Sequence, residues 1–227
     1  MKKILFIIPT LHGGGAEKVI SKIFTNLSKK KYSIKLLVFD GSKRKYLNRQ
    51  LENIIDLKKK KISYGFFNFI FEVRKFQPDV IISTLSHLNL FLSITKLFLP
   101  KKTKIILRES NFISYNLKHQ SYSFIMKFFY QIFYNYCDIC LVFSKKHKLD
   151  VIRNTNITLK KIKIIENPIN VKEIILLSKK KINKQHIKYF NPKYKKLLIL
   201  GSLSYQKGID IILNSLRFCK NNFVLNV

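Results

Sequence analysis

Short apolar runs alternate along this chain with segments that have the period of an amphipathic helix. Each run has the length of a buried strand, and each helical segment is long enough to cross over a sheet before the next strand begins. The strand-like runs are residues 2–8, 33–39, 79–83, 104–108 and 138–143, and the helical segments are 16–30, 65–76, 85–99, 121–136 and 144–154. This alternation favours a parallel sheet with right-handed crossovers, so the predicted fold class is α/β with a doubly wound sheet.

The alternation weakens after residue 167 and restarts at residue 195 as strand, glycine loop, helix and strand. Residues 1–167 are therefore predicted to form a complete domain, 168–194 a linker or surface helix, and 195–227 the first βαβ unit of a second domain. One βαβ unit is too small to bury a core of its own, so the second domain is expected to be incomplete in this chain. The polar, basic stretch 40–61 is expected to loop outward, apart from a short strand at 53–57.

Glycine is scarce in the sequence, and five of its seven glycines lie in two loops. Gly13, Gly14 and Gly15 follow the first predicted strand, where the loops of a doubly wound sheet face a ligand. Glycine at such a position allows a positive φ and lets backbone N–H groups approach a ligand closely. The sequence has neither a G-x-G-x-x-G motif nor a phosphate-loop lysine there. The predicted ligand is therefore an anionic or sugar-bearing substrate and not a nicotinamide cofactor, and the alternative is a flexible turn.

The second glycine loop adds a positive charge. Gly201 and Gly208 bracket this loop, and Lys207 stands just before a predicted helix. A cation and a helix N-terminus together can hold a diphosphate group. The alternative is an ordinary solvated surface lysine.

The net charge of +32 comes mainly from lysine. Base readout and bidentate phosphate contacts favour arginine, so nucleic acid is not an expected partner. Lysine acts at an anionic membrane surface as a point charge, and a membrane surface stays a candidate partner. The aromatic helix predicted at 121–136, with Lys118 and Lys127 beside it, is where that contact is expected. The alternative for this helix is a core position under the sheet.

Three cysteines, no cleavable leader and no membrane-spanning run favour a cytoplasmic protein, with a peripheral position on the inner face of the cell membrane left open. Cys137 and Cys140 form a C-x-x-C pair in a strand-like run. A structural zinc site needs a second pair and a redox pair normally opens a helix, so both cysteines are expected in the core. His87 is expected either to line the cleft or to be an ordinary residue at a helix start.

Six stretches of the chain carry a family resemblance. They are residues 4–20, 77–83, 105–111, 138–144, 164–170 and 200–213. In this order and spacing they resemble the retaining glycosyltransferases of GT-B fold, and among these the fourth sequence family, common in bacterial capsule, lipopolysaccharide and glycan assembly. The resemblance extends over essentially the whole chain.

The resemblance implies two Rossmann-like domains facing across a cleft, the first binding the acceptor and the second the nucleotide-sugar. It implies sugar transfer with retention to a glycan or lipid-linked acceptor, with no metal or other cofactor, because cations and helix dipoles stabilise the leaving diphosphate. The absence of an Asp-x-Asp metal motif agrees with this expectation. The implied catalytic residue is Lys207, and the implied substrate-binding residues are Gly13, Gly14, Gly15, Arg108, Glu109, Asn167, Gly201 and Ser202.

Three departures from the family pattern affect the predicted site. Ser202 stands where the family usually has an arginine on the diphosphate. Arg108 and Glu109 stand where some relatives have a catalytic histidine, and Glu109 is expected to contact a sugar, cap a helix or pair with Arg108. The family's pair of glutamates on the donor sugar would fall beyond residue 227, so most of the donor site is expected to be missing from this chain.

Three hypotheses about function therefore stand. The first is an enzyme that works with a separately encoded C-terminal half, and it predicts co-purification with that half. The second is an inactive truncated remnant, whose exposed strand edges predict aggregation. The third is a basic protein that binds membrane surfaces, with steeply salt-dependent binding and no response to nucleotide-sugars.

Overall fold

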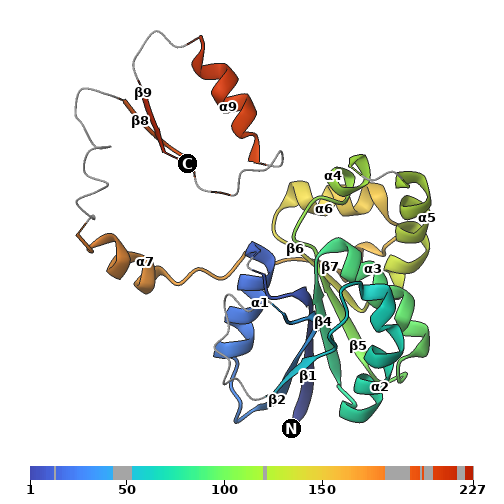
Figure 1. The fold of residues 1–227 in the computed structure, drawn as a ribbon. Coiled ribbons are helices and arrows are strands. Elements are labelled where there is room, and N and C mark those ends of the chain that lie inside the picture. The colour runs from blue at the N-terminus through green and yellow to red at the C-terminus, as the bar shows by residue number, and fades with distance from the viewer. Residues whose placement is uncertain are drawn as a thin grey trace. The chain divides into compact units, whose positions relative to one another are not determined.

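The computed structural model describes residues 1–12, 14–42, 53–119, 122–181, 195–199, 201, 207–218 and 223–226. The chain forms two compact units, Met1–Pro168 and Ile169–Val227, each with a sheet of its own (Figure 1).

Seven parallel strands form the sheet of the first unit, in the order β3-β2-β1-β4-β5-β6-β7. They are β1 Lys2–Thr10, β2 Tyr32–Asp40, β3 Ile54–Asp56, β4 Val80–Thr84, β5 Lys104–Arg108, β6 Ile139–Val142 and β7 Ile162–Ile164. The chain builds outward from β1 to β3 and then returns to add β4 to β7 on the other side of β1. In sheets of this class, ligands bind outside the carboxyl ends of the strands near such a reversal. The predicted doubly wound α/β fold is confirmed, and the predicted short strand at 53–57 is the edge strand β3.

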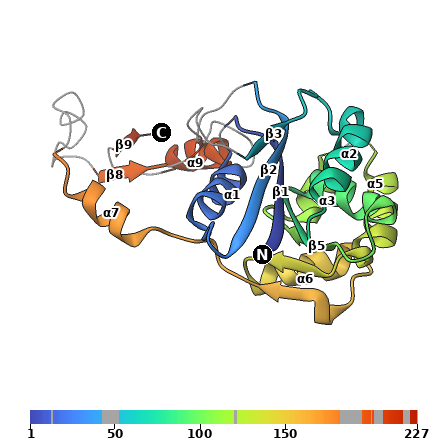
Figure 2. The ribbon, with the colours of Figure 1, turned by 90° about the horizontal axis from the view of Figure 1, so that it is seen from below.

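Helices cover both faces of this sheet (Figures 1 and 2). The helix α1 lies on one face, and α2, α3 and α5 lie on the other. The helices of the first unit are α1 Gly15–Asn26, η1 Ile62–Gly65, α2 Phe66–Phe76, α3 Ser86–Thr95, η2 Lys96–Phe98, α4 Ile113–Lys118, α5 Ser123–Phe133, η3 Tyr134–Tyr136, α6 Lys145–Asn154 and η4 Leu159–Lys161. None of the helices in the described part of the chain is both long and apolar enough to cross a membrane.

The central strand β1 is apolar from Ile4 to Pro9 because both of its faces are covered there, whereas Lys2 and Lys3 at its start are exposed. Leu5 and Ile7 belong to the cluster on the α2–α3–α5 side, while Phe6 and Ile8 belong to the cluster on the α1 side. Alternate residues of one strand thus serve two cores, which is why the sequence shows a continuous apolar run instead of an alternating one.

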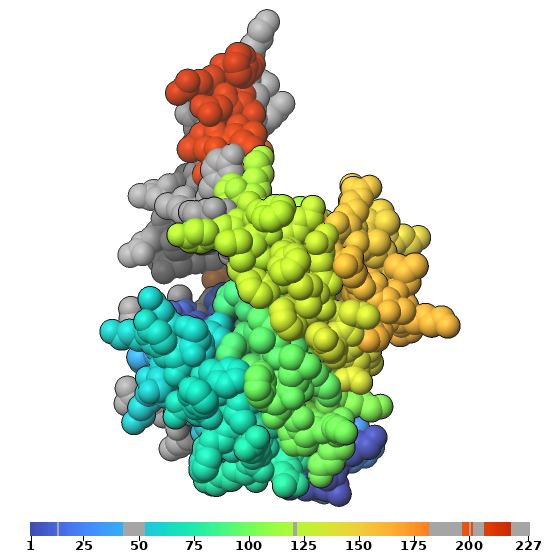
Figure 3. All heavy atoms as spheres, turned by 90° about the vertical axis from the view of Figure 1, so that its right-hand side faces the viewer, coloured from blue at the N-terminus to red at the C-terminus, as the bar shows by residue number. Residues whose placement is uncertain are grey.

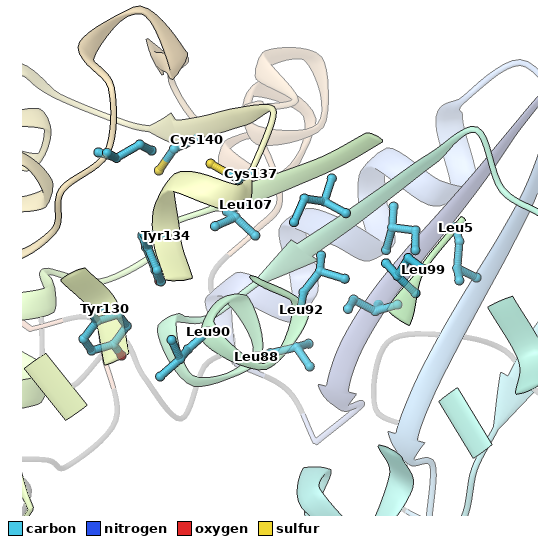
Figure 4. Close-up of a cluster of buried hydrophobic side chains, with 14 of the residues drawn as sticks. Leu5, Leu88, Leu90, Leu92, Leu99, Leu107, Tyr130, Tyr134, Cys137 and Cys140 are labelled. Atoms are coloured by element: carbon cyan, nitrogen blue, oxygen red, sulfur yellow. The ribbon is translucent and has the colours of Figure 1, made fainter. Parts of the chain in front are cut away.

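The larger core lies between the sheet and α3, and it includes both cysteines of the C-x-x-C pair (Figure 4). Both cysteines were expected in a strand-like run. Cys140 belongs to β6, whereas Cys137 directly follows η3 and lies before the strand. Both thiols are free and buried, and burial raises the pKa of Cys137 to about 12. The predicted core role is confirmed, and a thiol with so high a pKa is a poor nucleophile.

The second unit contains α7 Val171–Ser178, β8 Lys195–Leu198, α9 Ile209–Leu216 and β9 Phe223–Asn226. The strands β8 and β9 pair in parallel and α9 connects them along the chain, which is the predicted βαβ unit. Asn170 caps α7 by accepting a hydrogen bond from the backbone N–H of Glu173. No residue of α7 is buried, and α9 buries only Ile209.

Candidate functional site

The loop after β1 brings a carboxyl group to the N-terminus of α1. Glu17 stands in the first turn of α1, is only 7% exposed, and accepts a long hydrogen bond of 3.5 Å from Thr10 Oγ1 at the end of β1. A β-carbon on Gly14 would collide with the Glu17 carboxylate, whereas one on Gly15 would meet open space. Gly14 has a φ of −68°, so the expected positive φ is not found at this position, and the Glu17 carboxylate would have to move to admit a β-carbon there.

This carboxylate changes the ligand expected at the first glycine loop. A negative charge in the first turn already complements the positive end of the helix dipole. A second anion would therefore be repelled there, whereas sugar hydroxyl groups can donate hydrogen bonds to the carboxylate. Glu17 was not among the residues predicted from the sequence, although an acidic residue directly after a glycine loop is a visible signal. Gly13 lies outside the described residues.

The loop after β4 is strained. Leu85, between β4 and α3, has a φ of 75°, a conformation that costs a non-glycine residue about 1–3 kcal/mol. The strained residue fixes the start of α3, where Ser86 is buried and His87 is exposed. Neighbouring packing must supply that energy, and such strain is most often found at functional sites.

Glu109 lies at the centre of a buried polar network at the end of β5. Its carboxyl group is 1% exposed and accepts hydrogen bonds from Ser86 Oγ at 2.7 Å, from Asn89 Nδ2 and from Tyr134 Oη. Burial raises the pKa of Glu109, while the three hydrogen bonds act in the opposite direction. The network ties α3 and η3 to the carboxyl end of β5. Because Glu109 is buried inside this network, its predicted contact with a sugar stays a prediction.

Arg108 connects three strand ends. Its guanidinium donates to Thr84 Oγ1 at 2.9 Å, at the end of β4, and to Asn167 Oδ1 at 2.6 Å, beyond β7. Two predicted site residues, Arg108 and Asn167, are thus in direct contact. With Glu109 and Pro168 they line a small pocket of about 60 Å³. Whether this pocket meets a substrate stays a prediction.

The glycine loop of the second unit also brings predicted residues together. The aliphatic stem of Lys207 lies across Gly201, where a β-carbon would be 3.2 Å from Lys207 Cγ and Cδ. Gly208 begins α9 with a φ of 62°, a left-handed conformation that favours glycine. Lys207 is exposed directly before this helix, as predicted for a cation beside a helix N-terminus. Ser202 lies outside the described residues.

An apolar pocket of about 590 Å³ opens at the carboxyl ends of β1 and β2. Its lining comes from these strand ends, the segment before and within η1, and α3, namely Pro9, Thr10, Phe39, Lys60, Lys61, Ile62, Ser63, His87, Leu90, Phe91 and Ile94. His87 belongs to this lining and stands in the first turn of α3, as the helix-start alternative has it, and its place in a substrate cleft stays a prediction. The other lining residues were not predicted, because they lie far apart along the chain and come together only in the fold.

Apolar side chains are also exposed on the helices that cover the α3 side of the sheet. Phe124 on α5 is 84% exposed and Phe67 on α2 is 82% exposed. Other exposed apolar residues of this face are Phe71, Leu97, Phe98, Ile125, Phe128 and Ile132. In Figure 3, α2 (cyan), the α3–η2 segment (green) and α5 (yellow-green) make up one face of the first unit. The helix α5 buries only Tyr130, with Met126, Phe129 and Phe133 partly packed on the core, so it has one core-facing and one exposed apolar side.

No group of three or more histidine, cysteine, aspartate or glutamate side chains among the described residues is arranged to hold a metal ion.

Known proteins resemble this chain in sequence and in fold. An uncharacterised glycosyltransferase of Methanocaldococcus jannaschii is 27% identical over 150 residues, which are 64% of this chain and 37% of that protein. The apo form of WaaB, a lipopolysaccharide outer core galactosyltransferase, superposes on 99% of this chain with a TM-score of 0.63 and 17% identity. HepE of Anabaena, solved with UDP and glucose, superposes on 99% of it with a TM-score of 0.66 and 14% identity. This chain spans 60% of each of the two solved proteins.

The fold similarity and the sequence similarity agree in the first unit. The sequence profile of Glycosyltransferase Family 4 matches residues 13–173, which include α1, the Glu109 network and the segment around Asn167. The match covers well over half of the chain. The chain belongs to glycosyltransferase family 4.

Proposed function

We propose that this protein takes part in transferring a sugar from a nucleotide-sugar to a glycan or lipid-linked acceptor, with retention, in the assembly of surface polysaccharide or a related glycan. The observation that carries the proposal is the family match over residues 13–173. A related fold has been solved with UDP and glucose, which supports a nucleotide-sugar as donor.

The acceptor side of the proposed reaction belongs to the first unit. Thr10 and Glu17 offer hydrogen-bonding groups at the end of β1, next to the reversal of strand order. The Glu109 network holds the start of α3 in place, and with it His87, which lines the same pocket as Thr10. These groups suit the hydroxyl-rich surface of a sugar acceptor.

The donor side belongs to the glycine loop of the second unit. In this proposal the diphosphate of the nucleotide-sugar lies against Lys207 and the N-terminus of α9, which supply a positive charge and a helix dipole. When the glycosidic bond to the diphosphate breaks, negative charge develops on the leaving oxygen, and these two groups stabilise it. The proposal requires no metal ion for this step.

The exposed apolar face of α2, η2 and α5 supports a place for the protein at the inner surface of the cell membrane. Aromatic side chains enter the boundary between headgroups and acyl chains, and nearby lysines attract anionic lipids. Lys118 and Lys127 are exposed on α4 and α5 beside that face. An acceptor carried on a lipid would then be within reach.

Isothermal titration of the protein with UDP, GDP and UDP-sugars tests the donor side. We expect binding, and we expect Lys207→Gln to weaken it by about tenfold or more, since a charge-assisted contact contributes about 1.5–3 kcal/mol. The control is Lys172→Gln, which removes the same charge from exposed α7. Absence of binding by the folded protein, or an equal loss in both variants, would contradict the donor role of Lys207. Binding and transfer that appear only with an added C-terminal half would favour the two-chain enzyme.

A further inference from the structure

The apolar pocket at the ends of β1 and β2 has a floor of packed rings and branched side chains. Phe39 and Leu90 are buried beneath it, and the rings of Phe39 and Phe91 meet edge to face with centroids 5.5 Å apart. The volume of about 590 Å³ is in the range of sites that hold small molecules, roughly 300–1,000 Å³. The side chains of this floor have no hydrogen-bonding groups, so the floor favours a hydrocarbon chain over the hydroxyl groups of a sugar.

The rim of the same pocket is basic. Lys60 and Lys61 are exposed and belong to the lining, which contains no acidic side chain among the residues that the structure describes. The Lys61 ammonium lies 5.5 Å from the ring centroid of Tyr64. Asp40 lies close enough for Lys60 to contribute to the lowered pKa of its carboxyl group, although the hydrogen bond from Ser42 is the main cause. Two lysines above an apolar floor match a molecule with a hydrocarbon chain and an anionic head.

We propose that this pocket binds a phosphate-bearing hydrocarbon chain, with the chain on Phe39, Leu90 and Phe91 and the phosphate between Lys60 and Lys61. The ligand class is a single-chain alkyl or prenyl phosphate that enters the pocket as one molecule. Its assignment as the lipid carrier of the acceptor rests on the proposed glycosyltransferase function, whereas the binding itself does not.

The test is calorimetric titration of the protein with decyl phosphate below its micelle concentration, beside decyl glucoside and inorganic phosphate. We expect decyl phosphate to bind more tightly than the neutral amphiphile and inorganic phosphate not to bind measurably. Lys60→Gln combined with Lys61→Gln should weaken the binding of decyl phosphate by about tenfold or more, because its anionic head contacts the lysines. The binding of decyl glucoside, which has no charge, should be unchanged. Ser63→Trp, an exposed substitution at the rim, should block both amphiphiles.

The matched control is Lys101→Gln combined with Lys102→Gln, which removes the same charge from the loop before β5, at the amino end of that strand and away from the carboxyl ends where the pocket opens. Equal weakening by both lysine pairs would overturn the proposal in favour of general charge attraction. So would a folded protein that binds anionic vesicles but not monomeric decyl phosphate, since the membrane surface would then be the ligand. UDP titration of the same samples reports the donor loop separately, so a failed pocket and a failed glycosyltransferase function give different results.

Discussion

At the scale of single residues, Glu109 combines a titratable group with almost complete burial. Its carboxyl group accepts hydrogen bonds from three uncharged side chains, those of Ser86, Asn89 and Tyr134. Desolvation nevertheless prevails and raises its pKa above the ordinary range. A group in this position makes the stability of the fold depend on pH.

Replacing Glu109 by glutamine is expected to flatten that dependence. Because the folded pKa is raised, the stabilising contribution is fully present below the unfolded pKa of about 4.3 and is lost as the pH rises through the folded pKa. Urea unfolding of wild type and Glu109→Gln from about pH 4 to 8 measures this, and the wild-type free energy of unfolding should fall more steeply. Glu72→Gln on α2 is the control and should follow wild type. Parallel curves for wild type and Glu109→Gln would contradict a raised pKa.

A second residue-scale contrast concerns two glycines at helix starts. Gly208 has a φ of 62°, so Gly208→Ala should lower the stability of the second unit by about 1–2 kcal/mol. Gly15 starts α1 without a positive φ and with open space around it, so Gly15→Ala should be neutral or slightly stabilising. Hydrogen exchange of the α9 and α1 amides measures both changes. Equal effects would show that the left-handed conformation at Gly208 does not hold in solution.

At the scale of elements, the helix α5 is a case in which the sequence alone does not predict which side chains are buried. Its apolar residues occupy more than one side, so their periodicity could not distinguish a core helix from a membrane-facing one. The structure gives it both kinds of surface, with Tyr130 inside and Phe124 outside.

Membrane contact through this face predicts a charge effect. Lys118→Glu combined with Lys127→Glu should weaken binding to vesicles that contain phosphatidylserine by roughly tenfold or more, because each lysine near the surface contributes about 1 kcal/mol. Vesicle co-sedimentation at low and high salt measures it. The control is Lys29→Glu combined with Lys30→Glu, which makes the same charge change just after α1, the helix that covers the other face of the sheet. Binding that falls equally in both pairs would remove α5 as the contact.

Strand and helix positions followed from the sequence, whereas most of the site geometry did not. The run 2–8 predicted β1 because its residues from Ile4 to Ile8 are all apolar, as in a strand that is covered on both faces. The segment that begins at Ser144 predicted α6, and Ser144 caps this helix by accepting a hydrogen bond from the His147 N–H at 3.1 Å. Both signals are local. The network of Ser86, Glu109 and Tyr134 depends on which strand ends the topology brings together, and no local pattern encodes that.

At the scale of the whole molecule, the described helices of the two units differ in how many of their residues they bury. The first has a core on each face of its sheet, while α7 buries none of its residues and α9 only one. A unit with few buried contacts opens at lower free energy.

Native-state hydrogen exchange of the intact protein should therefore show two levels of protection. The amides of β1, β4 and β5 are expected to exchange slowest, and those of β8 and β9 faster by at least about tenfold. Addition of a nucleotide-sugar that binds the glycine loop should slow exchange in β8 and β9 selectively. Uniform protection across both units would contradict their unequal cores.

The short edges of the seven-stranded sheet have a consequence for handling the protein. Both outer strands, β3 and β7, are three residues long and expose few free backbone groups to another chain. Templated growth of fibres needs a long, flat edge, so this unit is a poor seed for amyloid. Losses during purification should instead come from apolar contacts between the exposed faces of α2, η2 and α5 on neighbouring copies. We expect these contacts to give an amorphous precipitate that mild detergent redissolves.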